Sequence, residues 1–328
     1  MNTAQKLARS GGPALGEAMK FVTICRALDP QNDYPHIGDL QWWCRDGSLD
    51  DQQNWHFWYQ ENGEALALGI IAGDEIVCLL HPDFRTHERY LMVHQWAVQR
   101  VKERAGQQGE NQYEIWEQAW GLASGDDLEM VSFLEREGYE RQEMYYHCYR
   151  RPLIEPVPAP ILPTGFTIRP VAGEAEAEMR AALQRDAFQR DAFFPQGSTT
   201  YEEGTLRQLA VMKMPQYDPQ LDLMVMAPDG TPAAGCICWV DPVNRVGLFE
   251  PVGTRPQFRR QGLATALMLG GLQRLRERGM QAALVTGAHP GKEEKSTEFT
   301  SSRFVYEAVG FQLLCRTYLY HKVFATAV

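Results

Sequence analysis

The residues best suited to chemistry lie in one short stretch, Arg259–Thr265, between a predicted strand and a predicted helix. The first amides of a helix lack intrahelical acceptors and carry the positive end of its dipole. Gly262 has no Cβ, so a phosphate group could approach the backbone closely, and the small Ala264 keeps the first turn open. Arg259 and Arg260 add positive charge. We therefore predict an anion-binding site made of Arg259, Arg260, Gln261, Gly262, Leu263, Ala264 and Thr265. A capped surface helix with two solvated arginines is the alternative interpretation of these residues alone.

The elements around this stretch recur in the other half of the chain, which predicts an internal duplication. Each half has three strands, then a Pro-x-Phe-Arg turn, then a long helix, and these turns lie 174 residues apart. The predicted strands span 55–60, 65–71 and 75–80 in one half, and 221–227, 233–240 and 246–254 in the other. The helices span 90–104 and 262–278, and an x-x-x-Gly-aromatic pattern follows each, at Leu134–Tyr139 and Tyr306–Phe311. Chance recurrence of strand–turn–helix order is the alternative.

This order of elements predicts the fold class. The turns Asn62-Gly63 and Asp229-Gly230 favour antiparallel hairpins, and each long helix favours a parallel crossover. Closing strands at 141–150 and 311–323 complete the halves. We expect an α/β fold, with an α+β mixed sheet in each of two tandem domains.

Proline marks the boundary between the halves, because Pro156, Pro158, Pro160 and Pro163 favour an extended linker. We predict a flexible tail at 1–18, a first domain at 19–152, a linker at 153–164 and a second domain at 165–328.

Composition narrows the classes of partner. The 328 residues are 44% hydrophobic and 23% charged, which is typical of a globular protein, and the net charge is −10. Such a charge disfavours nucleic acid and anionic membrane surfaces as partners. No apolar run is long enough to span a bilayer, and we see no secretory signal. The seven cysteines show no Cys-x-x-Cys pair, so we predict buried free thiols in the cytoplasm and no metal site.

The stretch from Leu248 to Leu272 resembles the acyl-CoA-binding motif of the GNAT superfamily, in which Gln/Arg-x-x-Gly-x-Gly/Ala follows a strand and opens a helix. Arg259, Gly262 and Ala264 match the signature positions. The resemblance implies that acetyl-CoA is the co-substrate and that Val252, Gly253 and Thr254 pair with its pantetheine arm. Phe299 and Ser302 stand where the family often has Asn and Ala, and the loop Ala288–Thr300 is longer and more charged than usual.

The first half resembles the same fold, but its loop lacks the residues that the motif requires. Glu88 stands where the motif requires glycine, and Tyr90 stands where it requires a small residue. A carboxylate repels a diphosphate, and a side chain at this position blocks the approach to the backbone. We therefore expect a degenerate first domain that binds no acyl-CoA, an arrangement similar to tandem GNAT chains of the mycothiol-synthase type.

Two residues are candidates for proton transfer. Tyr306 resembles the family tyrosine that protonates the departing thiolate, although a core aromatic would have the same spacing. Glu250 is the candidate general base, since burial would raise its pKa toward neutrality; it could equally pair with an arginine or bind the acceptor's ammonium. Period-two alternation predicts Glu250, Val252 and Thr254 on one face of the strand and Phe249, Pro251 and Gly253 on the other.

The resemblance implies an N-acetyltransferase that moves an acetyl group from acetyl-CoA to a primary amine of a small molecule, by direct attack in the second domain. We expect a monomer or homodimer. The alternative is a non-catalytic acyl-CoA-binding or assembly module built from two GNAT-like lobes.

Overall fold

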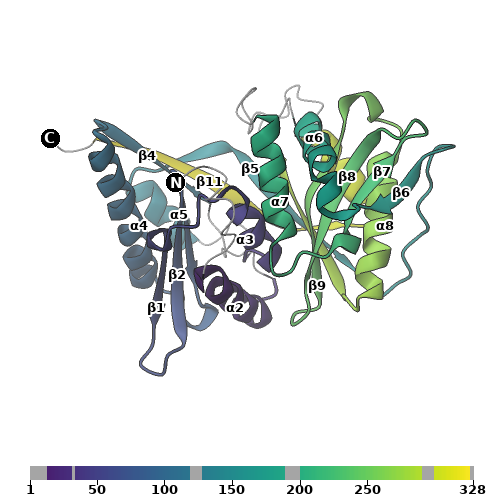
Figure 1. The fold of residues 1–328 in the computed structure, drawn as a ribbon. Helices are drawn as coiled ribbons and strands as arrows, with labels where there is room; N and C mark the ends of the chain where they lie inside the picture. The colour runs from purple at the N-terminus through teal and green to yellow at the C-terminus, as the bar shows by residue number, and fades with distance from the viewer. Residues whose placement is uncertain (1–12, 32–33, 119–127, 189–199, 290–298, 326–328) are drawn as a thin grey trace.

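Eleven strands form one continuous mixed sheet in the computed structural model, which describes residues 13–31, 34–118, 128–188, 200–289 and 299–325 (Figure 1). The first half contributes β1 (Trp55–Tyr59), β2 (Ala65–Ala72), β3 (Glu75–Leu80), β4 (Gln112–Gln118) and β5 (Glu140–Pro152). The second half contributes β6 (Thr167–Pro170), β7 (Asp222–Met226), β8 (Pro232–Asp241), β9 (Val246–Thr254), β10 (Ala282–His289) and β11 (Gln312–Ala325). Only the pairs β3–β4 and β9–β10 are parallel among these strands, as the crossovers predict, so the expected fold class is confirmed.

Helices cover both faces of the sheet. One face packs α4 (His87–Gln108), α5 (Leu128–Arg136), α8 (Leu263–Glu277) and α9 (Phe299–Ala308) against it. The other face packs α2 (Pro13–Leu28), α3 (Ile37–Trp43), α6 (Ala177–Phe188) and α7 (Tyr201–Met212). None of the helices within the described ranges is long and apolar enough to cross a bilayer.

The two halves exchange their last strands. The strand order is β1-β2-β3-β4-β11-β5-β10-β9-β8-β7-β6, so β11 lies between β4 and β5, and β5 pairs with β10 of the other half. Cys148 of β5 is opposite both Cys315 of β11 and Thr286 of β10. The predicted boundary at 152 coincides with the end of β5. The halves nevertheless share one sheet, because the closing strand of each half pairs with strands of the other half.

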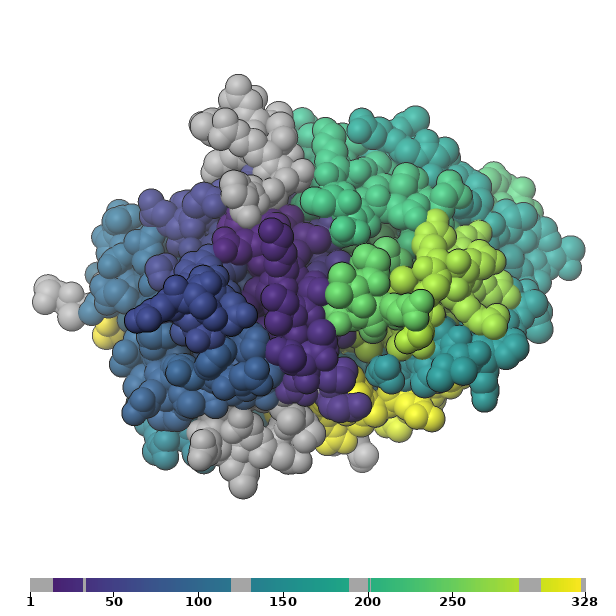
Figure 2. All heavy atoms as spheres, turned by 90° about the horizontal axis from the view of Figure 1, so that it is seen from below, coloured from purple at the N-terminus to yellow at the C-terminus, as the bar shows by residue number. Residues whose placement is uncertain are grey.

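The segment 13–18, expected within a flexible tail, forms the first turns of α2, which corrects that prediction. Leu15 and Ala18 are buried there in an apolar cluster that also contains Trp239 and Leu248 of the second half. Figure 2 shows α2 lying between the two halves on one face of the molecule. The chain from Ala14 onward is therefore part of the core that joins the halves.

Candidate active site

The strands β9 and β10 part to form a fork. They pair in parallel from Val246 opposite Ala282 to Phe249 opposite Val285. Beyond that rung β9 continues along β8 to Thr254, whereas β10 continues along β5 to His289. The strands thus part after Phe249, and the side of β9 from Glu250 onward faces the fork and not a neighbouring strand.

A bulge at the start of the fork changes which way the side chains of β9 point. Phe249 is opposite Cys238 and Val252 is opposite Cys236, so β9 carries one residue more than β8 between these rungs. As a result Phe249 and Val252 pack into the same core under α8. A Cβ on Gly253 would instead meet Ala187 of α6 at 2.8 Å. The predicted alternation is therefore wrong beyond Phe249, because one inserted residue shifts the period-two pattern.

Glu250 lies at this bulge, half-buried and close to charged side chains. The indole Nε1 of Trp239 donates a hydrogen bond to the Glu250 carbonyl oxygen at 2.9 Å, which fixes the backbone there. Burial raises the pKa of the Glu250 carboxyl to about 8; the negative charge of Asp39 raises it further and the positive charge of Arg45 lowers it. The carboxyl group can thus exchange a proton near neutral pH, as a general base must.

Tyr306 lies on α9 near the same fork and is 7% exposed. Its ring contacts Tyr149 and Phe311, and Gly287 of β10 faces it closely enough that a Cβ there would meet the ring at 3.1 Å. Burial, followed by the charge of Glu250, raises the pKa of the phenol above its usual range. Tyr306 is therefore both a core aromatic and a protonated donor within electrostatic reach of Glu250.

The predicted anion-binding stretch is open at the N-terminus of α8. Gly262 is the N-cap, with φ of 76° and no side-chain cap, and a Cβ at this position would meet nothing within 4 Å. Arg260, Gln261 and Gly262 are exposed, whereas Leu263 is buried and anchors the helix. The Ala266 amide donates to the Gly262 carbonyl, so the preceding amides of the first turn have no intrahelical acceptor.

Arg259 braces this stretch. Its Nε donates to the Thr254 carbonyl oxygen at 3.2 Å and its Nη2 donates to the Ala187 carbonyl oxygen at 2.9 Å. The side chain therefore ties the end of β9 and the end of α6 to the loop that precedes α8. Its predicted contact with a phosphate stays a prediction, as do those of the other residues from Val252 to Thr265.

Two charged residues of the first half, Asp39 and Arg45, also face Glu250, and sequence reasoning missed them. Asp39 lies on α3, and Arg45 lies in the short 3₁₀ helix η1 (Cys44–Asp46) that follows it. They precede Glu250 by more than 200 residues, so no local spacing relates them to it. The only nearby signal was the His36–Asp39 capping box, which predicts a helix start and not a site.

Metal chemistry finds no support in the described part of the chain, where no group of three His, Cys, Asp or Glu side chains is arranged to hold an ion. Residues 290–298 of the predicted acceptor-side loop Ala288–Thr300 lie outside the described residues.

Comparison with known proteins shows which family the second half resembles. Residues 183–303 match the model of the acetyltransferase (GNAT) family, a range that contains the fork, Glu250 and the open stretch before α8. This part of the chain is therefore similar to the GNAT family. The chain is also 32% identical over 170 residues to the mycothiol acetyltransferase of Thermobispora bispora, a match that covers 49% of this chain and 52% of that relative.

Solved structures show that the whole chain has a GNAT-type fold. A GCN5-related N-acetyltransferase from Sphaerobacter thermophilus is 20% identical and superimposes with a TM-score of 0.67, covering 98% of this chain and 96% of that one. A tandem GNAT protein from the clavulanic acid biosynthesis pathway is 14% identical, with a TM-score of 0.59 and coverage of 96% and 95%. The expected tandem GNAT-like fold is thereby confirmed over both halves.

Proposed function

We propose that this chain is a GNAT-family acetyltransferase, that it transfers an acetyl group from acetyl-CoA to a primary amine of a small molecule, and that the reacting groups lie in its second half. The observation that carries the proposal is the coincidence of three features at one fork: amides without intrahelical acceptors at the start of α8, the unpaired side of β9, and a half-buried carboxyl with a raised pKa at Glu250. Among the described residues, the point in the first half where β3 and β4 part does not combine these three features.

The residues of the open stretch fit an acyl-CoA. The amides at Gln261–Thr265 and the charge of Arg260 would bind the diphosphate, because Gly262 leaves open space and no side chain caps the helix. The β9 segment Val252–Thr254 would pair with the pantetheine arm along the fork. Acetyl-CoA supplies the activated acetyl group as a thioester.

In the reaction, the Glu250 carboxylate accepts a proton from the attacking amine, directly or through water. Backbone amides at the fork stabilise the negative charge that develops on the carbonyl oxygen. The phenol of Tyr306, held protonated by its raised pKa, donates its proton to the departing thiolate. The proton removed from the amine and the proton given to the thiolate balance, so no further reactant is required.

An amine panel with acetyl-CoA tests this proposal against the non-catalytic alternative. Glu250→Gln should lower kcat roughly 100-fold or more, and Tyr306→Phe should also lower it, while the affinity for acetyl-CoA stays within a few-fold of wild type. Tyr139→Phe, in the matching Gly-aromatic motif of the first half, is the control and should leave kcat unchanged. Binding of acetyl-CoA without transfer to any amine would favour the binding module instead.

We propose that the acceptor is a small-molecule amine. We also propose that the protein is a monomer or a homodimer. All seven cysteines are buried free thiols in the described chain, which supports our proposal of a reducing, cytoplasmic environment.

A further inference from the structure

We propose that the first half is part of the active site: Asp39 and Arg45 act as positioning residues that set the charge of Glu250 from across the seam between the halves. This inference rests on the proposed function of Glu250. It gives the degenerate half a role in the reaction that does not require it to bind acyl-CoA.

The helix α3, which carries Asp39, is held against β9 by one contact and against β8 by another. The Nε2 atom of His36, the N-cap of α3, lies 3.1 Å from the Val246 carbonyl oxygen. One residue into the helix, a Cβ on Gly38 would lie 2.5 Å from Cβ of Trp239, so only glycine permits this approach. The same tryptophan donates to the Glu250 carbonyl oxygen. Asp39 is thus positioned relative to Glu250 by packing and not by a flexible loop.

Arg45 is fixed as firmly. Its guanidinium lies over the ring of Trp42, with Cζ 4.3 Å from the ring centroid, and its Nη1 donates to the Trp42 carbonyl oxygen at 2.6 Å. The 3₁₀ helix that carries it packs against α7 of the second half. A guanidinium restrained in this way presents a constant charge to the fork.

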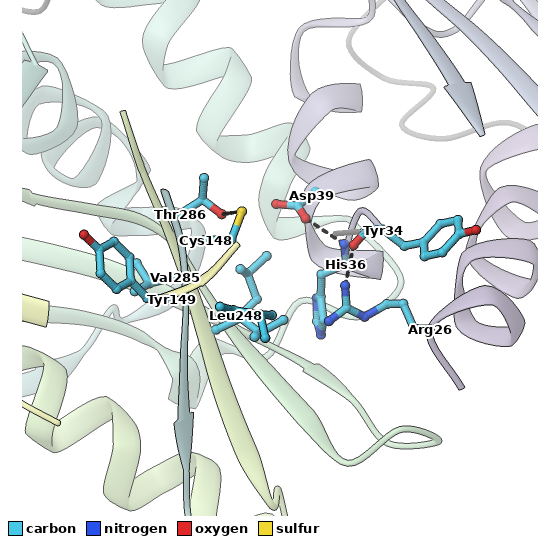
Figure 3. Close-up of a pocket in the computed structure, with 11 residues that line it drawn as sticks. Arg26, Tyr34, His36, Asp39, Cys148, Tyr149, Leu248, Val285 and Thr286 are labelled. Carbon is cyan, nitrogen blue, oxygen red and sulfur yellow. Dashed lines mark hydrogen bonds between the residues drawn. The ribbon is translucent and has the colours of Figure 1, made fainter. Parts of the chain in front are cut away.

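A small cavity lies beside the fork and joins the two halves (Figure 3). Asp39 and His36 line one side of it, and Leu248, Cys148 and Thr286 line the other. Thr286 follows Val285, the last residue of β10 that pairs with β9, so the cavity begins where the strands part.

The charged and titratable groups that face Glu250 come from three elements. Asp39 comes from α3, Arg45 from η1, and Tyr306 from α9. Arg45 in turn feels its neighbour Asp46 and Arg207 of α7. Of those that act on Glu250 directly, only Asp39 and Arg45 belong to the first half, and they have opposite signs. Removing one of them must therefore shift the Glu250 pKa in the direction opposite to removing the other.

The test is a ¹³C NMR titration of the full-length protein labelled at glutamate side chains, with the Glu250 resonance assigned by its loss in Glu250→Gln. Loss of a like charge in Asp39→Asn should lower the pKa of Glu250, and loss of an opposite charge in Arg45→Met should raise it, each by about one pH unit. Arg45→Lys keeps the charge and should return the titration toward that of wild type. Asp83→Asn, an exposed carboxylate of the same half, is the control and should change nothing.

Enzyme kinetics provide the second readout. These measurements use an amine that the protein acetylates. The acidic limb of the profile of kcat against pH should move to lower pH in Asp39→Asn and to higher pH in Arg45→Met. The KM for acetyl-CoA should be unchanged. Shifts in the same direction, or no shift in either variant, would overturn the inference, as would an unmoved kcat limb when the titration itself has moved. Equal transfer rates in wild type and Glu250→Gln would instead overturn the proposed function, and this result can be told apart because it leaves the titration shifts intact.

Discussion

The molecule contains two forks that share a plan but differ in what fills them. In the second half, β9 and β10 part after Phe249 and Val285; in the first half, β3 and β4 pair only at Glu75–Trp116 and Ile76–Glu117. A long helix starts beside each fork after a Pro-x-Phe-Arg turn. The helix start beside the second fork has open space around Gly262, whereas buried side chains fill the first fork.

The helix starts differ first. In the first half Thr86 is the N-cap of α4, and its hydroxyl accepts from the Arg89 amide. By the 174-residue offset Arg89 corresponds to Leu263, so α4 begins two residues earlier than α8. The Thr86 hydroxyl therefore occupies one first-turn amide of α4, whereas no side chain caps an amide at the start of α8.

The forks also differ in the side chain that faces them. Tyr90, which corresponds to Ala264, is buried, and its hydroxyl donates to the buried carboxyl of Glu117 at the last rung of the β3–β4 pair. His94 lies 3.5 Å from the same carboxyl and 2.9 Å from the Tyr139 hydroxyl. A cluster of polar side chains thus occupies the first fork, with the Tyr90 hydroxyl and the Glu117 carboxyl at its centre.

The largest expected effect comes from copying that tyrosine into the second half. Ala264→Tyr should lower the affinity for acetyl-CoA on the order of a thousandfold, about 4 kcal/mol, because the ring would occupy the first turn of α8. Isothermal titration calorimetry measures this. Ala264→Gly, the other residue that the family motif allows, is the control and should bind within a few-fold of wild type; similar affinities in both variants would contradict the account.

The buried carboxyl of the first fork should make stability depend on pH. Burial raises the pKa of Glu117 to about 8 in the folded chain, so the folded state holds this proton more tightly than the unfolded state. Its contribution is complete below the unfolded pKa, near 4.5, and is lost as pH rises toward 8. Between pH 5 and 8.5, Glu117→Gln should therefore gain roughly 3 kcal/mol relative to wild type in its free energy of unfolding. Parallel curves for the two proteins in denaturant titrations at several pH values would refute this.

Removing only the Tyr90 hydroxyl should have a smaller effect. Tyr90→Phe leaves the buried Glu117 carboxyl without that donor and should cost about 2 kcal/mol of stability, measured by chemical denaturation. The affinity for acetyl-CoA should stay that of wild type, because we expect this fork to bind none. A loss of acetyl-CoA affinity would mean that the forks are not independent.

The smallest effect is expected at the helix cap. Thr86→Ala removes the side-chain acceptor for the Arg89 amide and should cost about 1 kcal/mol, with faster hydrogen exchange in the first turn of α4. The start of α8 has no such side chain to lose, since Gly262 is its N-cap. Unchanged exchange at the start of α4 would show that packing, and not the cap, fixes where this helix begins.

Local patterns in the sequence predicted the elements well. The predicted strand 246–254 has the same bounds as β9, and the apolar period at 262–278 gives α8 within one residue at each end. The glycine signature located the open helix start, because an N-cap with positive φ is a local property of Gly262. The start of the proline-rich segment likewise coincides with the end of β5 at Pro152.

What the sequence did not reveal depends on contacts between distant residues. The closing strands β5 and β11 carry similar patterns, so nothing local distinguishes pairing within a half from exchange between halves. The bulge at Glu250 inverts the side chains after it without a change in composition. Asp39 and Arg45 reach Glu250 only because α3 packs on β9, and that requires the whole fold.

The central claim is that acetyl-CoA binds at one fork only, through the open start of α8. The most direct test is the stoichiometry and affinity of acetyl-CoA by calorimetry in wild type, Gly262→Glu and Gly230→Glu. Both glycines have positive φ and open space around them, so the two variants carry matched strain and matched charge. The account predicts one site per chain, lost in Gly262→Glu and kept in Gly230→Glu; two sites per chain, or undiminished binding in Gly262→Glu, would contradict it.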